Sequence, residues 1–127
     1  MPQVIGLGGI FFKCKDPEKL KAWYQEHLGI SGEYGVMFSW KEQSEKNSGA
    51  FTLFSPFKSD TDYFAPSEKP FMFNFVVDDL VGMLAKLKSE GVEVMEKTEE
   101  YDYGKFGWIM DQEGNKVELW EAPKTTN

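Results

Sequence analysis

The chain contains two similar halves. A strand-like run, an aspartate, an amphipathic helical segment and a closing glycine follow one another in residues 10–29, where the aspartate is Asp16. The same succession returns in residues 71–91, where the aspartate is Asp79, about half a chain later. A duplication of this kind predicts two similar modules with one pocket built between them.

Each half predicts a strand, a capped helix and further strands. Residues 4–14 and 71–77 are strand-like. Asp16 in the first half, and Asp78 or Asp79 in the second, are suited to accept hydrogen bonds from the first free amides of the helices that follow. Shorter strands are expected at residues 34–40, 50–54, 92–95, 105–110 and 116–120, with a solvent-exposed acidic loop at 97–102.

The expected organisation is a single domain of residues 1–127. Module one spans about 1–54, module two spans 71–121, and 122–127 form a tail. The linker at 55–70 carries Phe57, Tyr63 and Phe64, more aromatic surface than an indifferent connection needs, so we expect it to cover part of the protein.

Composition excludes several classes of partner. Twenty-one acidic and fourteen basic residues give a formal charge of −7, which repels nucleic-acid phosphates and anionic lipid heads. All the basic residues are lysines, so no guanidinium is present to grip an anionic ligand with two parallel hydrogen bonds. Cys14 is the only cysteine, and no basic region followed by a long apolar stretch opens the chain, so we expect a cytoplasmic protein that neither crosses nor binds membranes.

Three stretches together resemble the vicinal oxygen chelate superfamily, which includes glyoxalase I, bleomycin resistance proteins and extradiol dioxygenases. They are the opening from Phe12-Lys-Cys-Lys-Asp-Pro17 to Leu28-Gly29, the segment Val77-Asp-Asp-Leu80 with Gly91-Val92, and the ending Asp111-Gln-Glu-Gly-Asn-Lys-Val-Glu-Leu-Trp-Glu121. The resemblance implies an α+β fold of two βαβββ modules, whose paired curved mixed sheets surround a central funnel with the helices outside. It also implies a homodimer, because dimers are common in the superfamily.

The resemblance further implies a metal position, from which this sequence departs. Family ligands, usually His or Glu, point into the funnel from the first and last strand of each module, and the matching positions here are Gly9, Thr52, Met72 and Glu118. A divalent Lewis acid generally needs about three protein donors. Only Glu118 is a plausible ligand, so we expect neither a metal nor another cofactor.

Strand alternation places Asn74 and Glu118 inside the funnel. A buried amide needs a partner, so Asn74 is expected to bond either a ligand or backbone across the module interface. Glu118 could act as a general base, or its carboxylate could be held by Lys13 or by water near a solvated rim. His27, the sole histidine, lies on the face of the first helix that is expected to pack against the sheet.

The aromatic residues favour a pocket that stacks against a flat or apolar guest, which the negative charge predicts to be neutral or cationic. The residues expected to bind it are Phe11, Lys13, Trp40, Thr52, Phe54, Phe57, Tyr63, Met72, Asn74, Tyr103, Trp108 and Trp120.

Three functions remain open at this level. The first is a small-molecule-binding protein that, like the bleomycin resistance proteins, sequesters a ligand in its funnel without metal chemistry. The second is a lyase, isomerase or dioxygenase that uses Glu118, either with a relocated metal or by metal-free acid–base chemistry on a carbonyl compound. The third is a structural or interaction domain, whose aromatic side chains would fill the funnel to below ~300 Å³, the lower end for ligand pockets.

Overall fold

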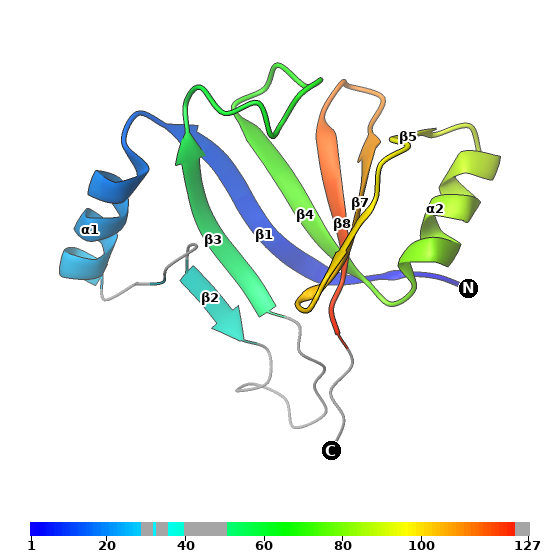
Figure 1. The fold of residues 1–127 in the computed structure, drawn as a ribbon, viewed down its shortest axis with the longest axis horizontal. Coiled ribbons are helices and arrows are strands. Elements are labelled where there is room, and N and C mark those ends of the chain that lie inside the picture. The colour runs from blue at the N-terminus through cyan, green and yellow to red at the C-terminus, as the bar shows by residue number, and fades with distance from the viewer. Residues whose placement is uncertain (29–31, 33–35, 40–50, 124–127) are drawn as a thin grey trace.

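One curved mixed sheet forms the centre of the molecule, with a helix at either end of it (Figure 1). The computed structural model describes residues 1–28, 32, 36–39 and 51–123. The strand order in the sheet is β2 (Val36–Ser39), β3 (Phe51–Lys58), β1 (Val4–Cys14), β4 (Phe71–Val77), β8 (Lys116–Glu121), β7 (Gly104–Met110) and β5 (Glu93–Val94), while β6 (Glu99–Tyr101) pairs with β7. The helices are α1 (Pro17–Leu28) and α2 (Leu80–Ser89).

The two halves of the sequence correspond to two halves of this sheet. In the first half β1 runs parallel to β3, and in the second β4 runs parallel to β8. The halves are joined edge to edge where β1 pairs antiparallel with β4. The α+β fold expected from the sequence is therefore confirmed, and the sheets of the two modules form one continuous surface.

The two repeated aspartates begin the helices as expected. Asp16 Oδ1 accepts a hydrogen bond of 3.1 Å from the Lys19 amide, and Asp79 Oδ1 accepts one of 3.0 Å from the Gly82 amide. Each bond satisfies a backbone donor that has no partner within its own helix. These caps fix where the chain turns from strand into helix in both modules.

Helix α2 covers the outer face of the second module. Its Leu80 and Met83 pack against Val77 of β4 and against Val117 and Leu119 of β8, and all five side chains are buried. Because successive residues of a strand point to opposite faces, Glu118 between the last two must point to the inner face.

A connecting segment, residues 59–70, crosses the inner face between β3 and β4 (Figure 1) and is called the strap below. Its Phe64 side chain is completely buried in a cluster with Phe11, Met72 and Trp108. The amide of Lys13 donates a 2.8 Å hydrogen bond to the carbonyl of Pro70 and fixes the far end of the strap.

The length of β3 and the presence of β6 differ most from the sequence-based expectation. Strand β3 continues to Lys58, into the expected linker, because β1 pairs with it as far as Cys14–Lys58. Pro56 is tolerated there because the described part of β2 pairs only with residues 51–54, so no described strand requires its missing N–H on that side. The stretch 97–102, expected as a loop, contains β6, which forms a hairpin with β7.

None of the described helices is long and apolar enough to cross a membrane.

Replacement of Phe64 by alanine tests how firmly the strap is held. We expect a loss of about 3–5 kcal/mol in the free energy of unfolding, because the ring leaves a cavity under the strap. Phe73→Ala is the matched control, since that ring is 42% exposed on the outer face and should cost less than half as much. Urea unfolding measures both, and equal losses would contradict the central place of Phe64.

Candidate functional site

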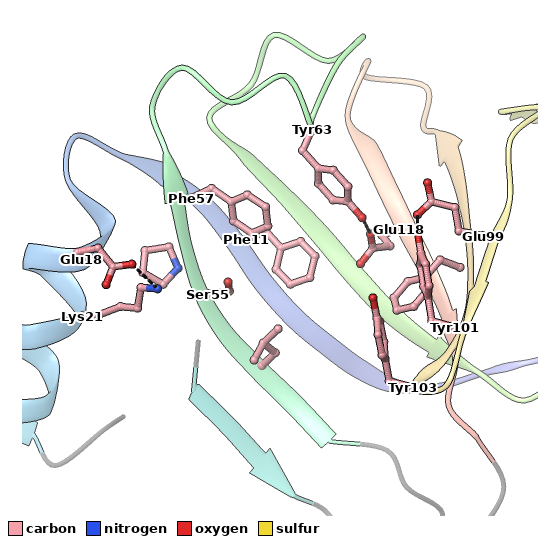
Figure 2. A pocket seen from close by; sticks show the side chains of 13 residues that line it. Phe11, Glu18, Lys21, Ser55, Phe57, Tyr63, Glu99, Tyr101, Tyr103 and Glu118 are labelled. Atoms are coloured by element: carbon pink, nitrogen blue, oxygen red, sulfur yellow. Dashed lines mark hydrogen bonds and ion pairs between the residues drawn. The ribbon is translucent and has the colours of Figure 1, made fainter. Parts of the chain in front are cut away.

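The inner face of the sheet encloses a pocket of about 680 Å³. Rings from opposite sides of the curved sheet face this hollow, and the strap contributes one more (Figure 2). The aromatic lining consists of Phe11, Phe57, Tyr63, Tyr101, Tyr103 and Phe106. The charged lining consists of Glu18, Lys21, Glu99 and Glu118.

Glu118 is the most buried charged group of the pocket, with 2% of its surface exposed. Its Oε1 accepts a 2.5 Å hydrogen bond from the Tyr63 hydroxyl and a 3.0 Å bond from the Trp108 indole N–H. Its Oε2 accepts a 2.5 Å bond from Asn74 Nδ2. The sheet register explains two of these contacts, because Glu118 lies opposite Asn74 on β4 and opposite Trp108 on β7.

Asn74 therefore binds a neighbouring side chain, neither of the two partners expected from the sequence. Among the described residues its Oδ1 is the one buried side-chain polar atom without a hydrogen-bond partner. The pairing of β1 with β4 is irregular between Leu7 and Gly9, and Gly8 lies in that irregularity. A Cβ at Gly8 would collide with Asn74 Oδ1, so glycine is what allows the amide to lie against the backbone.

Burial and hydrogen bonding act in opposite directions on Glu118. Burial raises the pKa of its carboxyl group, while the donors Tyr63, Asn74 and Trp108 and the charge of Lys116 act to lower it. Burial prevails. The pKa of Tyr63 is also raised, first by its burial and then by the negative charge of Glu118, so its hydroxyl stays protonated as a donor.

Lys116 fastens the strap above this cluster. Its Nζ donates a 2.7 Å hydrogen bond to the carbonyl of Tyr63 and lies 5.3 Å and 5.4 Å from the ring centroids of Tyr63 and Trp108. Burial lowers the pKa of the Lys116 ammonium, against the opposing effect of the charges on Glu118 and Glu99. Lys116 was not among the residues expected from the sequence, although its spacing of two from Glu118 on one strand places both on the inner face.

The structure brings together part of the expected set. Phe11, Phe57, Tyr63, Tyr103 and Glu118 line the pocket. Four others lie buried around or beneath it without lining it, namely Met72, Asn74, Trp108 and Trp120. Lys13 does not touch Glu118, and its Nζ lies 5.8 Å from the Phe64 ring centroid.

Thr52 and Phe54 are corrected to the outer face. Phe11 of β1 lies opposite Ser55, so the inner residues of β3 are Leu53, Ser55 and Phe57, one position away from the expected alternation. The Thr52 hydroxyl donates to the Leu7 carbonyl, and the Phe54 ring lies 5.4 Å from Phe12 on the outer face. Trp40 and the side chain of His27 lie outside the described residues.

Tyr101 and Glu99 line the pocket and were missed because residues 97–102 were expected as a loop. Phe106 also lines the pocket and was not among the expected residues, although it lies in the expected strand 105–110. Pairing Glu99 with Phe106 and Tyr101 with Gly104 forms the β6–β7 hairpin. The sequence did contain one indication of this hairpin, because tyrosines stand on either side of Asp102, a pattern typical of two strands joined by a tight turn.

The described residues do not fit a divalent cation at Glu118. No group of three or more His, Cys, Asp or Glu side chains in residues 1–28, 36–39 and 51–123 is placed to hold a metal ion. The atoms that contact the Glu118 carboxylate are O–H and N–H donors, whose hydrogens point at the oxygens that a metal would need. A site of this kind lacks the roughly three protein donors that a catalytic metal uses. The absence of a metal stays a prediction.

The raised pKa of Glu118 predicts how stability depends on pH. A carboxyl whose pKa is higher in the folded than in the unfolded state binds its proton more tightly when folded. Its stabilising contribution is fully present below the unfolded value of about 4.3 and is lost as pH rises through the folded value.

Glu118→Gln should therefore flatten the decline of unfolding free energy as pH rises above the unfolded value of about 4.3, compared with the unmodified protein. Glu113→Gln, at an exposed position before β8, is the control and should keep the original profile. Urea unfolding at a series of pH values provides the measurement. Parallel profiles for Glu118→Gln and the unmodified protein would show that burial does not govern this carboxyl.

Solved structures of the same fold include several methylmalonyl-CoA epimerases. The chain is 13% identical to a variant from Streptomyces coelicolor in complex with 2-nitronate-propionyl-CoA, with a TM-score of 0.70 over 98% of this chain and 100% of that one. The epimerase from Mycobacterium tuberculosis is 20% identical, with a TM-score of 0.62 over 94% and 89% of the two chains.

A structure from Legionella pneumophila described as an NAD-dependent benzaldehyde dehydrogenase is 13% identical, with a TM-score of 0.58 over 91% of this chain and 98% of that one. Proteins described by different activities thus share this fold, and identities at this level establish the fold alone. No curated protein sequence matches the chain.

The family model of the glyoxalase/bleomycin resistance protein/dioxygenase superfamily matches residues 6–119, a span that includes both modules and Glu118. It agrees with the resemblance carried by the two capped helices and the final turn and strand. This chain belongs to the glyoxalase/bleomycin resistance protein/dioxygenase superfamily.

Proposed function

We propose that this protein binds a flat, largely apolar small molecule in the inner pocket, without a metal centre. The observation that carries the proposal is a pocket of about 680 Å³ with six aromatic side chains around one buried carboxylate. Ligand pockets in proteins are typically ~300–1,000 Å³, lined by apolar and aromatic groups with a few polar ones. The size of the pocket argues against a structural domain with a filled core.

The rings at the β6–β7 hairpin support stacking as the mode of binding. Tyr101 and Tyr103 are stacked on each other, with centroids 5.0 Å apart and planes at 14°. They nevertheless remain 47% and 57% exposed. A ligand in the pocket would cover this apolar surface, and each ring that it contacts would contribute about 0.5–1.5 kcal/mol beyond the area buried.

The distribution of polar groups supports a guest with few charges to satisfy. The lining offers three carboxylates and one ammonium, and the Lys21 ammonium lies 3.3 Å from the Glu18 carboxylate. A strongly anionic guest would find little compensation there. A neutral or cationic guest fits better.

A second function, proton transfer by Glu118, is favoured by one specific observation. Glu118 is a buried carboxylate with a raised pKa that lines the pocket, which is the environment of a general base. Its Oε1 accepts two hydrogen bonds but its Oε2 accepts only one from the described residues, so Oε2 retains a lone pair that can accept a proton.

This enzyme hypothesis is testable without a known substrate. Exchange of the α-protons of a panel of small carbonyl compounds in D₂O, followed by NMR, would reveal catalysed proton abstraction. We expect any such exchange to disappear in Glu118→Gln while the affinity for the compound stays within about twofold. Exchange that persists in Glu118→Gln would remove this residue from the mechanism.

The homodimer and the cytoplasmic location expected from the sequence remain part of the proposal. A two-fold dimer would repeat the pocket in each subunit. Light scattering of the purified protein tests the subunit count.

Replacement of Tyr103 by leucine tests the stacking surface. With N-methyl-2-quinolone as a neutral planar probe, we expect Tyr103→Leu to weaken binding roughly 2- to 12-fold, the equivalent of ~0.5–1.5 kcal/mol. Phe73→Leu is matched, because Phe73 also belongs to a stacked pair and is 42% exposed, but on the outer face. It should leave the affinity unchanged in calorimetric titrations.

Equal weakening by the two substitutions would contradict the location of the binding surface. No binding of any planar probe at millimolar concentration would contradict the proposed function itself.

A further inference from the structure

Three of the four charged side chains that line the pocket have an opposite charge in contact. Lys21 Nζ lies 3.3 Å from Glu18 Oε1, so these two neutralise each other. Glu99 Oε2 lies 2.9 Å from the Nζ of Lys97, which stands outside the pocket. Both pairs are formed within the protein and leave no charge for a guest to balance.

Glu118 is the exception. Its three hydrogen-bond donors, Tyr63, Asn74 and Trp108, are neutral groups. No ammonium of the described residues lies within ion-pair distance of its carboxylate. A carboxylate that is 2% exposed and has no counter-ion in contact costs free energy when it ionises, and a positive charge in the pocket would recover part of that cost.

Lys116 is the cation that acts on the Glu118 carboxyl group, and it does not take that place. Its Nζ is engaged by the Tyr63 carbonyl at 2.7 Å and by the faces of the Tyr63 and Trp108 rings. It acts on Glu118 only through space, and its effect on the Glu118 pKa is smaller than that of burial. The side of Glu118 that lines the pocket is thus available to a charge carried by a guest.

The aromatic walls favour the same kind of guest. Phe11 and Phe57 lie to one side of Glu118 in Figure 2, Tyr101 lies to the other side, and Tyr103 lies below it. The face of an aromatic ring carries negative electrostatic potential, and a cation over such a face gains about 0.5–2 kcal/mol. Delocalised positive charge on a flat ring system combines this attraction with stacking.

From these contacts we infer that the pocket selects a planar organic cation, with its rings between the aromatic walls and its positive charge directed at Glu118. This inference rests on the proposed small-molecule-binding function and narrows it to one chemical class. Aromatic ammonium, amidinium and N-alkylated heteroaromatic ions belong to that class.

Binding of such a cation is coupled to the proton on Glu118. A positive charge beside the carboxylate favours its ionised form, so the pKa that burial raises in the free protein falls on binding. The groups that face the carboxylate are Tyr63, Asn74, Trp108 and, through space, Lys116. Of these, Tyr63 stays protonated and Asn74 and Trp108 do not titrate, which leaves Glu118 and the Lys116 ammonium, whose pKa burial lowers, as sources of a released proton. Proton release that disappears in Glu118→Gln assigns the proton to Glu118.

Two planar bicyclic probes of similar size test the inference. N-methylquinolinium is a planar cation, and N-methyl-2-quinolone is its neutral counterpart. We expect the cation to bind roughly 3- to 30-fold more tightly by calorimetry, the equivalent of ~0.6–2 kcal/mol. In Glu118→Gln this preference should fall by about threefold or more relative to the unmodified protein, whereas Glu113→Gln, which removes an exposed charge before β8, should retain it.

A second measurement needs no variant. Titrations of the unmodified protein in buffers of different ionisation enthalpy, at a series of pH values above about 4.3, should show protons released when the cation binds and none when the quinolone binds. Equal affinity of the two probes, or cation binding without proton release at every pH, would overturn the inference while leaving a small-molecule pocket in place. Failure of both probes and of every other planar compound to bind would overturn the proposed function as well.

Discussion

The antiparallel pairing of β1 with β4 is the contact on which the rest of the structure depends. These strands are the first of each module, and their pairing places Phe11 beside Met72 and Gly9 beside Asn74 on the inner face. Without it, each half would be an open sheet with an exposed inner side and no pocket. The irregularity at Gly8 lies on this seam, where the absent side chain gives the Asn74 amide the room from which it reaches Glu118. A backbone detail in one module therefore positions a carboxylate in the other.

Two opposing effects of similar size, burial and hydrogen bonding, decide how readily Glu118 ionises. Removal of a carboxylate from water costs several kcal/mol even in a relaxed protein, and a hydrogen bond to a charged group returns about 1.5–3 kcal/mol. Three such donors offset much of the cost, yet the pKa remains raised, so burial still outweighs them. A divalent ion would have supplied the missing positive charge, but donors occupy the places that its other ligands would need. A cationic guest supplies the charge without requiring further protein ligands.

Local patterns in the sequence predicted the parts of the fold that local physics determines. The bounds of β1 and β4 follow from their apolar runs, and the start of each helix follows from Asp16 and Asp79, because capping involves residues only three apart. The inward direction of Glu118 followed from alternation along a short regular strand. Thr52 was placed on the wrong face because nothing within β3 says which of its alternating residues lies opposite Phe11, and that register is set by the neighbouring strand.

The contacts that the Glu118 carboxylate makes with distant residues were harder to predict from the sequence. Tyr63 and Glu118 are 55 positions apart and meet because Phe64 anchors the strap, which no local pattern reveals. Strand β6 was missed for a related reason, since its glutamates read as solvated loop while its pairing with β7 depends on the turn before Gly104. Long-range contacts of this kind decide which of many plausible polar residues share a site.

The duplicated halves have diverged into two chemically different walls. One row of the sheet runs through Leu53, Gly9, Asn74, Glu118 and Trp108, one residue from each of five adjacent strands. Within this row, module one contributes the Gly9–Leu53 pair and module two contributes the Asn74–Glu118 pair. Module one thus presents a small and an apolar residue where module two presents an amide and a carboxylate. A Cβ at Gly9 would lie 2.6 Å from the Leu53 carbonyl, so this wall is also kept thin by close packing of the backbone. A symmetric pair of walls could share a metal between them, whereas this unequal pair gives a bound molecule a direction, with its apolar part toward β1 and β3 and its polar or charged part toward β4 and β8.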